Sequence, residues 1–135
     1  MAAYWLFKQE PSTYNYQQLE KDGQTVWDGV ANNLALKHLR AVKKGDRALF
    51  YHTGDERQAV GIMDIVSDPY PDPKDESLTV VDVRPSRRLG RPVTLDQIKT
   101  DPAFAEWELV RISRLSVMPV PDRLWSRIMK MAEIL

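Results

Sequence analysis

The sequence predicts an α+β fold in which short helices flank a β-barrel, or a strongly curled sheet, of about five strands. Five segments are rich in the β-branched and aromatic residues that favour strands. Helical segments are fewer, and they lie toward both ends of the chain. Of the 135 residues, 43% are hydrophobic and 28% are charged, so we expect one soluble globular domain over residues 1–135.

The first third of the chain predicts one strand and two helices. Tyr4 to Lys8 is rich in aromatic residues, and Pro11 ends this strand because proline has no N–H to donate. A capping pattern over residues 15–18 begins a short helix that ends at Gly23. Asn32 to Val42 carries one narrow apolar stripe, so we expect a helix that packs on the sheet.

The middle of the chain predicts a β-hairpin, a loop and a further strand. Ala48 to Thr53 and Ala59 to Val66 are strand segments separated by a Gly-Asp turn, and together they favour a hairpin. Pro69 to Pro73 holds three prolines and is expected to be a rigid loop. Leu78 to Val83 is the fourth predicted strand.

The last third of the chain predicts a strand between helices. A capping box begins a helix over Leu95 to Lys99, and the Asp-Pro pair at 101–102 opens a further turn. Ile112 to Val120 is expected to be the fifth strand, on which the charge of Arg114 must reach solvent, a carboxylate or a phosphate. The last helix begins at Asp122, and its expected apolar face comprises Leu124, Ile128, Met131 and Leu135.

The charge of the chain argues against binding nucleic acid by bulk attraction. Lys and Arg number 19, Asp and Glu also number 19, and the sequence pI is about 6.7, whereas such domains usually have a pI above roughly 9. The balance is uneven, because four arginines fall within residues 84–91; we expect a solvated loop there, with phosphate contact as the alternative. No apolar run is long enough for a signal peptide or a membrane helix, so we expect a cytoplasmic protein that does not contact membranes.

Several kinds of site are excluded by the residues that are missing. There is no cysteine, and there are only two histidines, His38 and His52, so we expect no metal. The glycines are too scattered for a dinucleotide or phosphate loop, so we expect no cofactor. Nothing places a serine on a nucleophile elbow, which leaves a relay through His52 and Asp55 unsupported.

The aromatic residues favour a pocket that holds a flat ligand. Trp27 comes just before a turn glycine, and Asn32 follows at a helix start, so an aromatic plane and an amide lie close together. Core packing is the commoner role of a single tryptophan, and an asparagine before a helix is more often a cap. His52 ends a strand, where a histidine more often bonds to the backbone than to a ligand. Both interpretations of these residues stay open.

In order along the chain, the sequence resembles the EVE domain family. The matching segments are Tyr-Trp-Leu-Phe-Lys-Gln-Glu-Pro at 4–11, Val-Trp-Asp-Gly-Val at 26–30, Gly-Asp-Arg-Ala-Leu-Phe-Tyr-His-Thr at 45–53, Val-Gly-Ile at 60–62, Tyr-Pro-Asp-Pro at 70–73 and Arg-Leu-Ser-Val-Met-Pro-Val at 114–120. The resemblance implies a PUA-like fold, a curled barrel of five or six strands with helices around it. It also implies a pocket for a modified, typically methylated, nucleobase in DNA or RNA, with no catalysis.

The resemblance also assigns binding residues. It implies that Trp27, from the Trp-Asp-Gly-Val motif, is the wall on which the base stacks. Asn32 and backbone groups near His52 and Thr53 would read the base edge, and Lys8 with Arg114 would meet the adjacent phosphate. The complete implied set is Lys8, Glu10, Trp27, Asn32, His52, Thr53, Arg114, Leu115 and Ser116.

This chain departs from the family pattern next to Asn32. Where the family usually has Arg-Asn-Tyr-Gln-Ala-Arg, residues 31–36 read Ala-Asn-Asn-Leu-Ala-Leu, so an aromatic, a glutamine and two cations are missing, and Gln9 replaces a serine. These losses weaken phosphate contact and reshape one wall of the implied pocket. Two alternatives stay open. The first is a pocket for a small molecule or nucleotide, either in a binding domain or in an accessory enzyme with His52 as acid or base. The second is a protein-interaction barrel with an exposed apolar patch.

Overall fold

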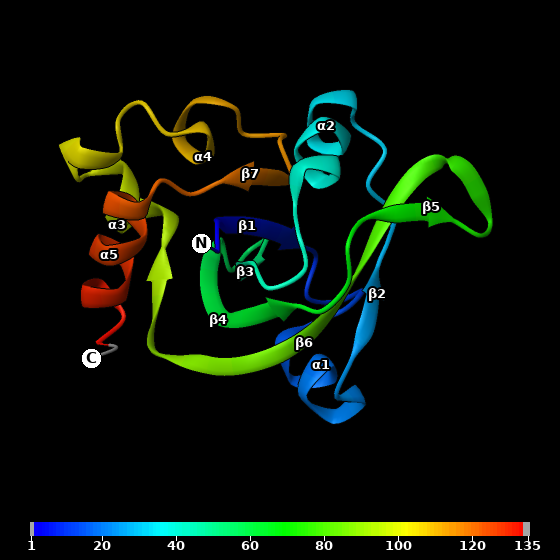
Figure 1. Ribbon diagram of the computed structural model, residues 1–135. Coiled ribbons are helices and arrows are strands. Elements are labelled where there is room, and N and C mark those ends of the chain that lie inside the picture. Colours follow the sequence, from blue (N-terminus) through cyan, green and yellow to red (C-terminus); the bar gives the residue numbers. More distant parts are fainter. Residues whose placement is uncertain (1, 134–135) are drawn as a thin grey trace.

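A computed structural model describes residues 2–133 and shows the predicted curled sheet with short helices around it (Figure 1). Within these residues the sheet has seven strands, in the order β2-β6-β4-β3-β1-β7, with β5 paired to β6 beside this path. The longest strand, β6, sweeps beneath β4 from the β5 end of the molecule to the C-terminal helix (Figure 1). In the described part of the chain, no helix is both long and apolar enough to cross a membrane.

The N-terminal strand lies near one end of the sheet, where it joins distant parts of the chain. β1 (Tyr4–Gln9) pairs in parallel with β3 (Arg47–His52) and antiparallel with β7 (Val117–Pro119). β3 also pairs antiparallel with β4 (Gln58–Ile65), which confirms the predicted hairpin. Tyr4 of β1 stacks on Trp125 of the C-terminal helix, so one face of this strand is turned toward that helix.

The prediction of a solvated loop over residues 84–91 is wrong, because β6 (Asp75–Thr94) runs unbroken through these residues. Arg84, Arg87 and Arg88 lie opposite residues of β4, and their long side chains are compatible with the exposed face of a sheet. Two short strands also pair with β6 and were missed. They are β2 (Thr25–Trp27) and β5 (Tyr70–Asp72), the latter within the predicted proline-rich loop.

The helices begin where their capping residues predict. The side chain of Asn15 accepts a hydrogen bond from the N–H of Gln18 at the start of α1 (Tyr16–Asp22), and Asn32 accepts from Ala35 at the start of α2 (Asn33–Ala41). The expected capping box begins α3 (Leu95–Lys99), and the turn at Pro102–Phe104 is a 3-10 helix, η1. The last helix is α5 (Asp122–Met131), and Leu135 of its predicted face lies outside the described residues.

The predicted strand over Ile112 to Val120 is mostly wrong. Only β7, at 117–119, reaches the edge of β1. Before it, α4 (Glu108–Arg111) is followed by a turn that the N–H of Leu115 closes on the carbonyl of Ile112 at 3.1 Å. Arg114 therefore lies in an exposed turn rather than on a strand face.

Aromatic side chains fill the barrel interior. The ring of Phe50 lies edge-on to both Tyr16 and Trp27, and Phe7 packs beside Trp27. The hydroxyl of Tyr16 donates to the carbonyl of Ile62 at 2.8 Å. Tyr16 is 1% exposed and Leu19 is fully buried, so these two side chains fix α1 to the sheet.

Tyr16 is expected to make the fold sensitive to alkaline pH. Burial, with the nearby charge of Glu20, raises the pKa of Tyr16 to about 12. The folded state therefore keeps a proton that the unfolded state releases near pH 10. As the pH rises from about 10 to 12, the unfolding free energy falls with a slope of up to about 1.4 kcal/mol per pH unit. Urea unfolding of the wild type and of Tyr16→Phe between pH 9 and 11 measures it. A pH dependence of equal slope in both proteins would contradict the assignment to Tyr16.

Candidate functional site

Two cavities lie on opposite faces of β1, near its C-terminal end. Because side chains alternate along a strand, Phe7 and Gln9 face the barrel interior, whereas Lys8 faces the other side. The paired strand β3 follows the same division, since Tyr51 lies opposite Lys8 in the register and Phe50 opposite Phe7. The sheet therefore separates Lys8 from Trp27, which the resemblance had placed around one nucleotide.

The first cavity, called here the Trp27 cavity, has a volume of about 230 Å³. Trp27 is only 4% exposed, and the centre of its ring lies 5.3 Å from that of Phe7 and 5.2 Å from that of Phe50. The indole therefore packs as a core residue, and only a small part of it reaches the cavity. This differs from the expected open stacking wall. The lining residues are Gln9, Thr13, Tyr14, Thr25, Val26, Trp27 and Asp28.

The rim of the Trp27 cavity combines polar and apolar groups. Asp28 is exposed and brings a carboxylate, while Val26 is 44% exposed and brings an apolar side chain. The hydroxyl of Tyr14 donates to Asp22 at 2.7 Å, and burial together with this bond raises the pKa of Tyr14 to about 12. Tyr14 is thus a neutral phenol at physiological pH.

Asn32 and His52 both carry out structural tasks. Asn32 caps α2, which is the commoner role of an asparagine before a helix, and it does not line the Trp27 cavity. His52 is 7% exposed; its Nε2 accepts from the N–H of Tyr16 at 3.2 Å, and its Nδ1 lies 2.8 Å from Glu56 Oε1. Nδ1 must therefore carry the proton. Both ring nitrogens are occupied, which argues against His52 as a catalytic acid or base.

The other implied residues cluster around the end of β1 on the Lys8 side. Glu10 accepts from Ser12, and its second carboxylate oxygen lies 3.5 Å from the hydroxyl of Thr53. The carbonyl of Ser116 accepts from the N–H of Lys8 at 2.9 Å. Leu115 is buried, and Arg114 is exposed in its turn. The implied set is therefore brought to one region of the fold but is divided between two faces.

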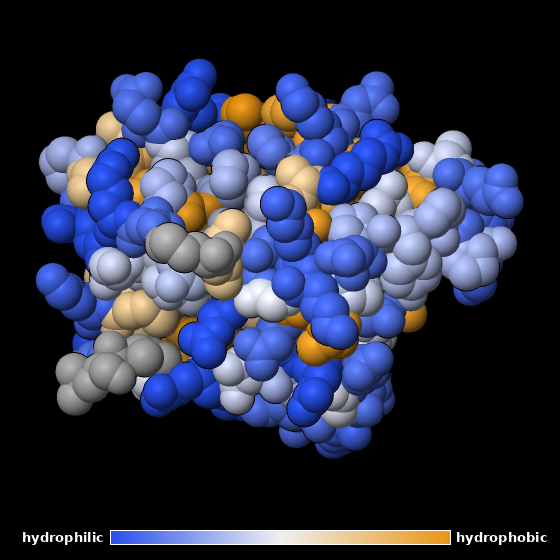
Figure 2. Space-filling view, viewed as in Figure 1, coloured by the Kyte–Doolittle hydropathy of each residue, from blue (hydrophilic) through white to orange (hydrophobic). Residues whose placement is uncertain are grey.

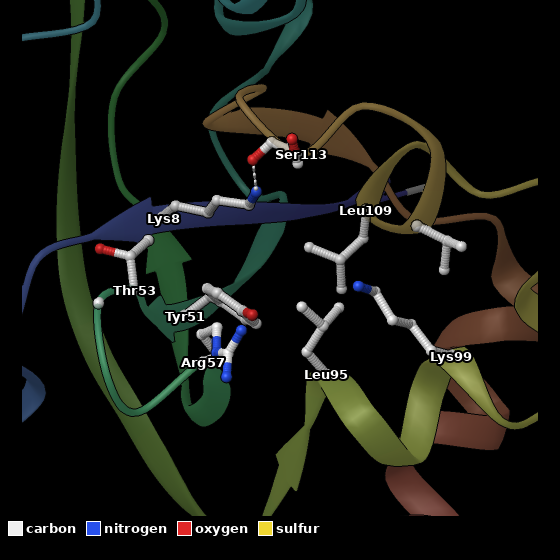
Figure 3. A pocket seen from close by; sticks show the side chains of 10 residues that line it. Lys8, Tyr51, Thr53, Arg57, Leu95, Lys99, Leu109 and Ser113 are labelled. Atoms are coloured by element: carbon white, nitrogen blue, oxygen red, sulfur yellow. Dashed lines mark hydrogen bonds between the residues drawn. The ribbon is translucent and has the colours of Figure 1, made fainter.

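The second cavity, called here the Lys8 cavity, has a volume of about 290 Å³ and lies between the sheet and helices α3 and α4 (Figure 3). The ammonium of Lys8 donates to the carbonyl of Ser113 at 2.9 Å and lies 5.7 Å from the centre of the Tyr51 ring. Burial lowers the pKa of Lys8. The residues around it are Lys8, Tyr51, Thr53, Gly54, Arg57, Leu95, Lys99, Leu109, Val110 and Ser113.

The sequence interpretation found only Lys8 and Thr53 of this cavity. Arg57 and Lys99 approach it from elements far apart in the chain, and no local pattern pairs them. Tyr51 could have been found, because it lies between Phe50 and His52 on an alternating strand and so faces away from both.

Two other expectations about the surface can be compared with the structure. Arg88 bonds to Glu20 at 2.6 Å, and Arg91 pairs with Glu133 at 2.7 Å, so two of the clustered arginines are already neutralised. On the face seen in Figure 2, apolar side chains are scattered among hydrophilic ones and form no broad patch that would favour a protein-interaction barrel. Within residues 2–133, no three His, Asp or Glu side chains gather as metal ligands would.

One family model and several similar proteins match nearly the whole chain. The family model described as "EVE domain" matches residues 3–131. Thymocyte nuclear protein 1 of Rattus norvegicus is 29% identical over an alignment of 169 residues, which covers 98% of this chain and 75% of that protein. A solved structure from Rhodopseudomonas palustris is 40% identical, with a TM-score of 0.93, and covers 99% of this chain and 95% of that one. The human THYN1 protein in complex with DNA containing 5-methylcytosine is 25% identical, with a TM-score of 0.91, and covers 98% of both chains.

Proposed function

Because this chain belongs to the EVE domain family, we propose that it binds nucleic acid carrying a modified base and catalyses no reaction on it. The observation that carries this proposal is the similarity of its fold, over 98% of the chain, to a human protein in complex with DNA containing 5-methylcytosine. The occupied nitrogens of His52 favour binding over catalysis.

The base is proposed to enter the Trp27 cavity. Asp28 can accept a hydrogen bond from the exocyclic amine of cytosine, which is the pairing that carboxylates make with this base. The exposed side chain of Val26 can contact a methyl group at C5, as apolar side chains contact the methyl of thymine. Trp27 then contacts the base only through the small part of its ring that is exposed.

Few phosphate contacts are expected to accompany the base. The net charge is zero, and Arg114 is the exposed cation that the resemblance assigns to a phosphate. A shallow dependence of affinity on salt follows, because each neutralised phosphate contributes a slope of only about −0.9 in duplex DNA. A steep fall of affinity with salt concentration, as for proteins that contact many phosphates along the DNA backbone, would contradict the expectation of few phosphate contacts.

The exchange of Asp28 for asparagine is expected to remove most of the preference for cytosine bases. The exchange removes the negative charge and replaces one of the two acceptor oxygens with an NH₂ donor, so binding of 5-methylcytosine DNA should weaken by about tenfold, since such contacts are worth roughly 1–3 kcal/mol. Tryptophan fluorescence or calorimetric titration with methylated and unmethylated oligonucleotides, as DNA and as RNA, measures this effect.

Glu106→Gln is the matched control, because it also removes one exposed carboxylate that makes no hydrogen bond or ion pair with the described residues. It should leave affinity unchanged. Equal affinity of the wild type for every methylated and unmethylated oligonucleotide would contradict the proposed function. An Asp28→Asn variant that still binds like the wild type would contradict only the role of Asp28.

A further inference from the structure

The Lys8 cavity is cationic and lies on the opposite face of the sheet from Trp27. Lys8, Arg57 and Lys99 line it, and no carboxylate is among its ten lining residues. Within residues 2–133, none of the three cations forms an ion pair. The nearest carboxylates lie outside: Glu10 packs against Gly54, and an adjoining groove that shares Arg57 holds Asp55, Glu56 and Asp96.

The hydroxyl of Tyr51 adds a hydrogen-bond donor to the three cations of the cavity. Tyr51 is 2% exposed, yet among the described residues its hydroxyl has no hydrogen-bond partner. Figure 3 shows this hydroxyl pointing into the cavity, toward Leu95 and the ammonium of Lys99. Burial raises the pKa of Tyr51 to about 12, so the group is a hydrogen-bond donor at physiological pH. Every fully buried side-chain nitrogen or oxygen of the described residues has a hydrogen-bond partner, so this hydroxyl reaches the surface of the cavity, where it can donate to a ligand.

Lys8 provides a further donor at the inner end of the cavity. Its ammonium can donate three hydrogen bonds, of which the structure shows one, to the carbonyl of Ser113. A carbonyl carries no full charge, so the positive charge of this half-buried group is not neutralised by its partner. Binding an anion beside Lys8 offsets the desolvation of the ammonium.

The remaining wall is apolar. Leu95, Leu109 and Val110 line the side of the cavity formed by α3 and α4. The ligand therefore has an anionic end and an organic part. The volume of about 290 Å³ lies near the lower end of the roughly 300–1,000 Å³ typical of small-molecule sites, which favours a small ligand.

We propose that the Lys8 cavity binds a nucleotide 5′-monophosphate, with the phosphate among Lys8, Arg57, Lys99 and the Tyr51 hydroxyl, and the organic part against the leucines. A phosphate monoester carries a charge of about −1.5 to −2 and three strong acceptor oxygens, so it matches three cations and a phenol better than a carboxylate does. The nucleotide can be free or can be the 5′-terminal residue of a strand. The proposal does not depend on base recognition at Trp27.

The test titrates the full chain with the four ribonucleoside 5′-monophosphates, the matching nucleosides and inorganic phosphate, followed by calorimetry or NMR. Saturable binding of at least one monophosphate is expected, with its nucleoside and inorganic phosphate each about tenfold weaker or more, as for loss of a charged hydrogen-bonding group. Binding of inorganic phosphate as tight as that of the nucleotides would overturn the assignment of the organic part. No saturation by any monophosphate up to about 10 mM would overturn the site itself.

Variants connect the binding to the cavity. Lys99→Gln is expected to weaken nucleotide binding about tenfold, because it removes a positive charge beside the phosphate, and Tyr51→Phe severalfold, because it removes a hydrogen-bond donor. The matched controls are Lys37→Gln, an exposed lysine of α2, and Tyr4→Phe, a tyrosine packed on Trp125; both should bind like the wild type. Binding that is unchanged in both Lys99→Gln and Tyr51→Phe would overturn the assignment.

The two sources of the nucleotide are separated by comparing oligonucleotides with and without a 5′-phosphate. If the phosphate strengthens binding in the wild type but not in Lys99→Gln, the cavity takes the end of a strand. If only free monophosphates bind there, it takes free nucleotides. Asp28→Asn should leave either result intact, so failure of this site is distinguishable from failure of base recognition at Trp27.

Discussion

Replacing Asp46 with alanine is expected to cost about 3–5 kcal/mol of unfolding free energy, because it leaves several buried donors without an acceptor. Asp46 is 4% exposed and accepts from the N–H of Ala3 at 3.0 Å, the indole N–H of Trp5 at 2.9 Å and the N–H of Lys43 at 2.9 Å. One carboxylate thereby joins the start of β1, the end of α2 and the start of β3. Urea unfolding followed by circular dichroism measures the loss.

Asp68→Ala is the control for this prediction. Asp68 also accepts a backbone hydrogen bond, from Lys44 at 3.0 Å, but that bond is exposed, so the cost should stay near 0.5–1 kcal/mol, roughly the net value of one bond. Asp46→Asn keeps one acceptor oxygen and should fall between the two. Equal stability of Asp46→Ala and Asp68→Ala would show that Asp46 does not hold these elements together.

Gly61→Ala is expected to destabilise the fold by about 3 kcal/mol, at the upper end of ordinary overpacking. A methyl group on Gly61 would lie 2.4–2.8 Å from three carbon atoms of the Tyr16 ring, well inside van der Waals contact. Tyr16 cannot move aside easily, because it is 1% exposed and its hydroxyl is bonded to the carbonyl of Ile62. Thermal and urea unfolding of the variant measure the loss.

A double-mutant cycle identifies the clash as the cause. In a Tyr16→Leu background the ring is absent, so adding the methyl group at position 61 should cost less than about 1 kcal/mol. If Gly61→Ala were equally costly in both backgrounds, the loss would come from the backbone of β4 rather than from contact with Tyr16.

Local hydrogen bonding explains which parts of the fold could be predicted from the sequence. The caps at Asn15, Asn32 and Thr94 depend on neighbours three residues away, so their helices begin where expected. The continuity of β6 depends instead on distant partners in β2, β4 and β5. Its arginine-rich segment has the local composition of a solvated loop, so the sequence alone predicted a loop there. The run over 112–120 alternates like a strand, but only its last part reaches a partner.

The geometry around the candidate site could be predicted only in part from the sequence. The resemblance names segments that lie near the end of β1, but a residue and its neighbour on a strand face opposite sides, so Lys8 and Gln9 line different cavities. The exposure of Trp27 depends on Phe7 and Phe50, which two other strands bring against it. The cations of the Lys8 cavity meet only because α3 and the β3–β4 turn pack together, which no short motif records.

The position of β1 also determines when the protein can fold. The outer edge of β1 is covered by β7, where Trp5 pairs with Pro119. Two strands separated by more than a hundred residues must therefore meet before this edge is closed. Such non-local pairing makes folding slow compared with helical domains of this size. During synthesis, the edge of β1 stays open to other chains until residue 119 has left the ribosome, and unpaired strand edges promote aggregation. Residues 117–119 therefore protect the chain as well as complete the sheet, because their pairing closes the edge of β1 to other strands.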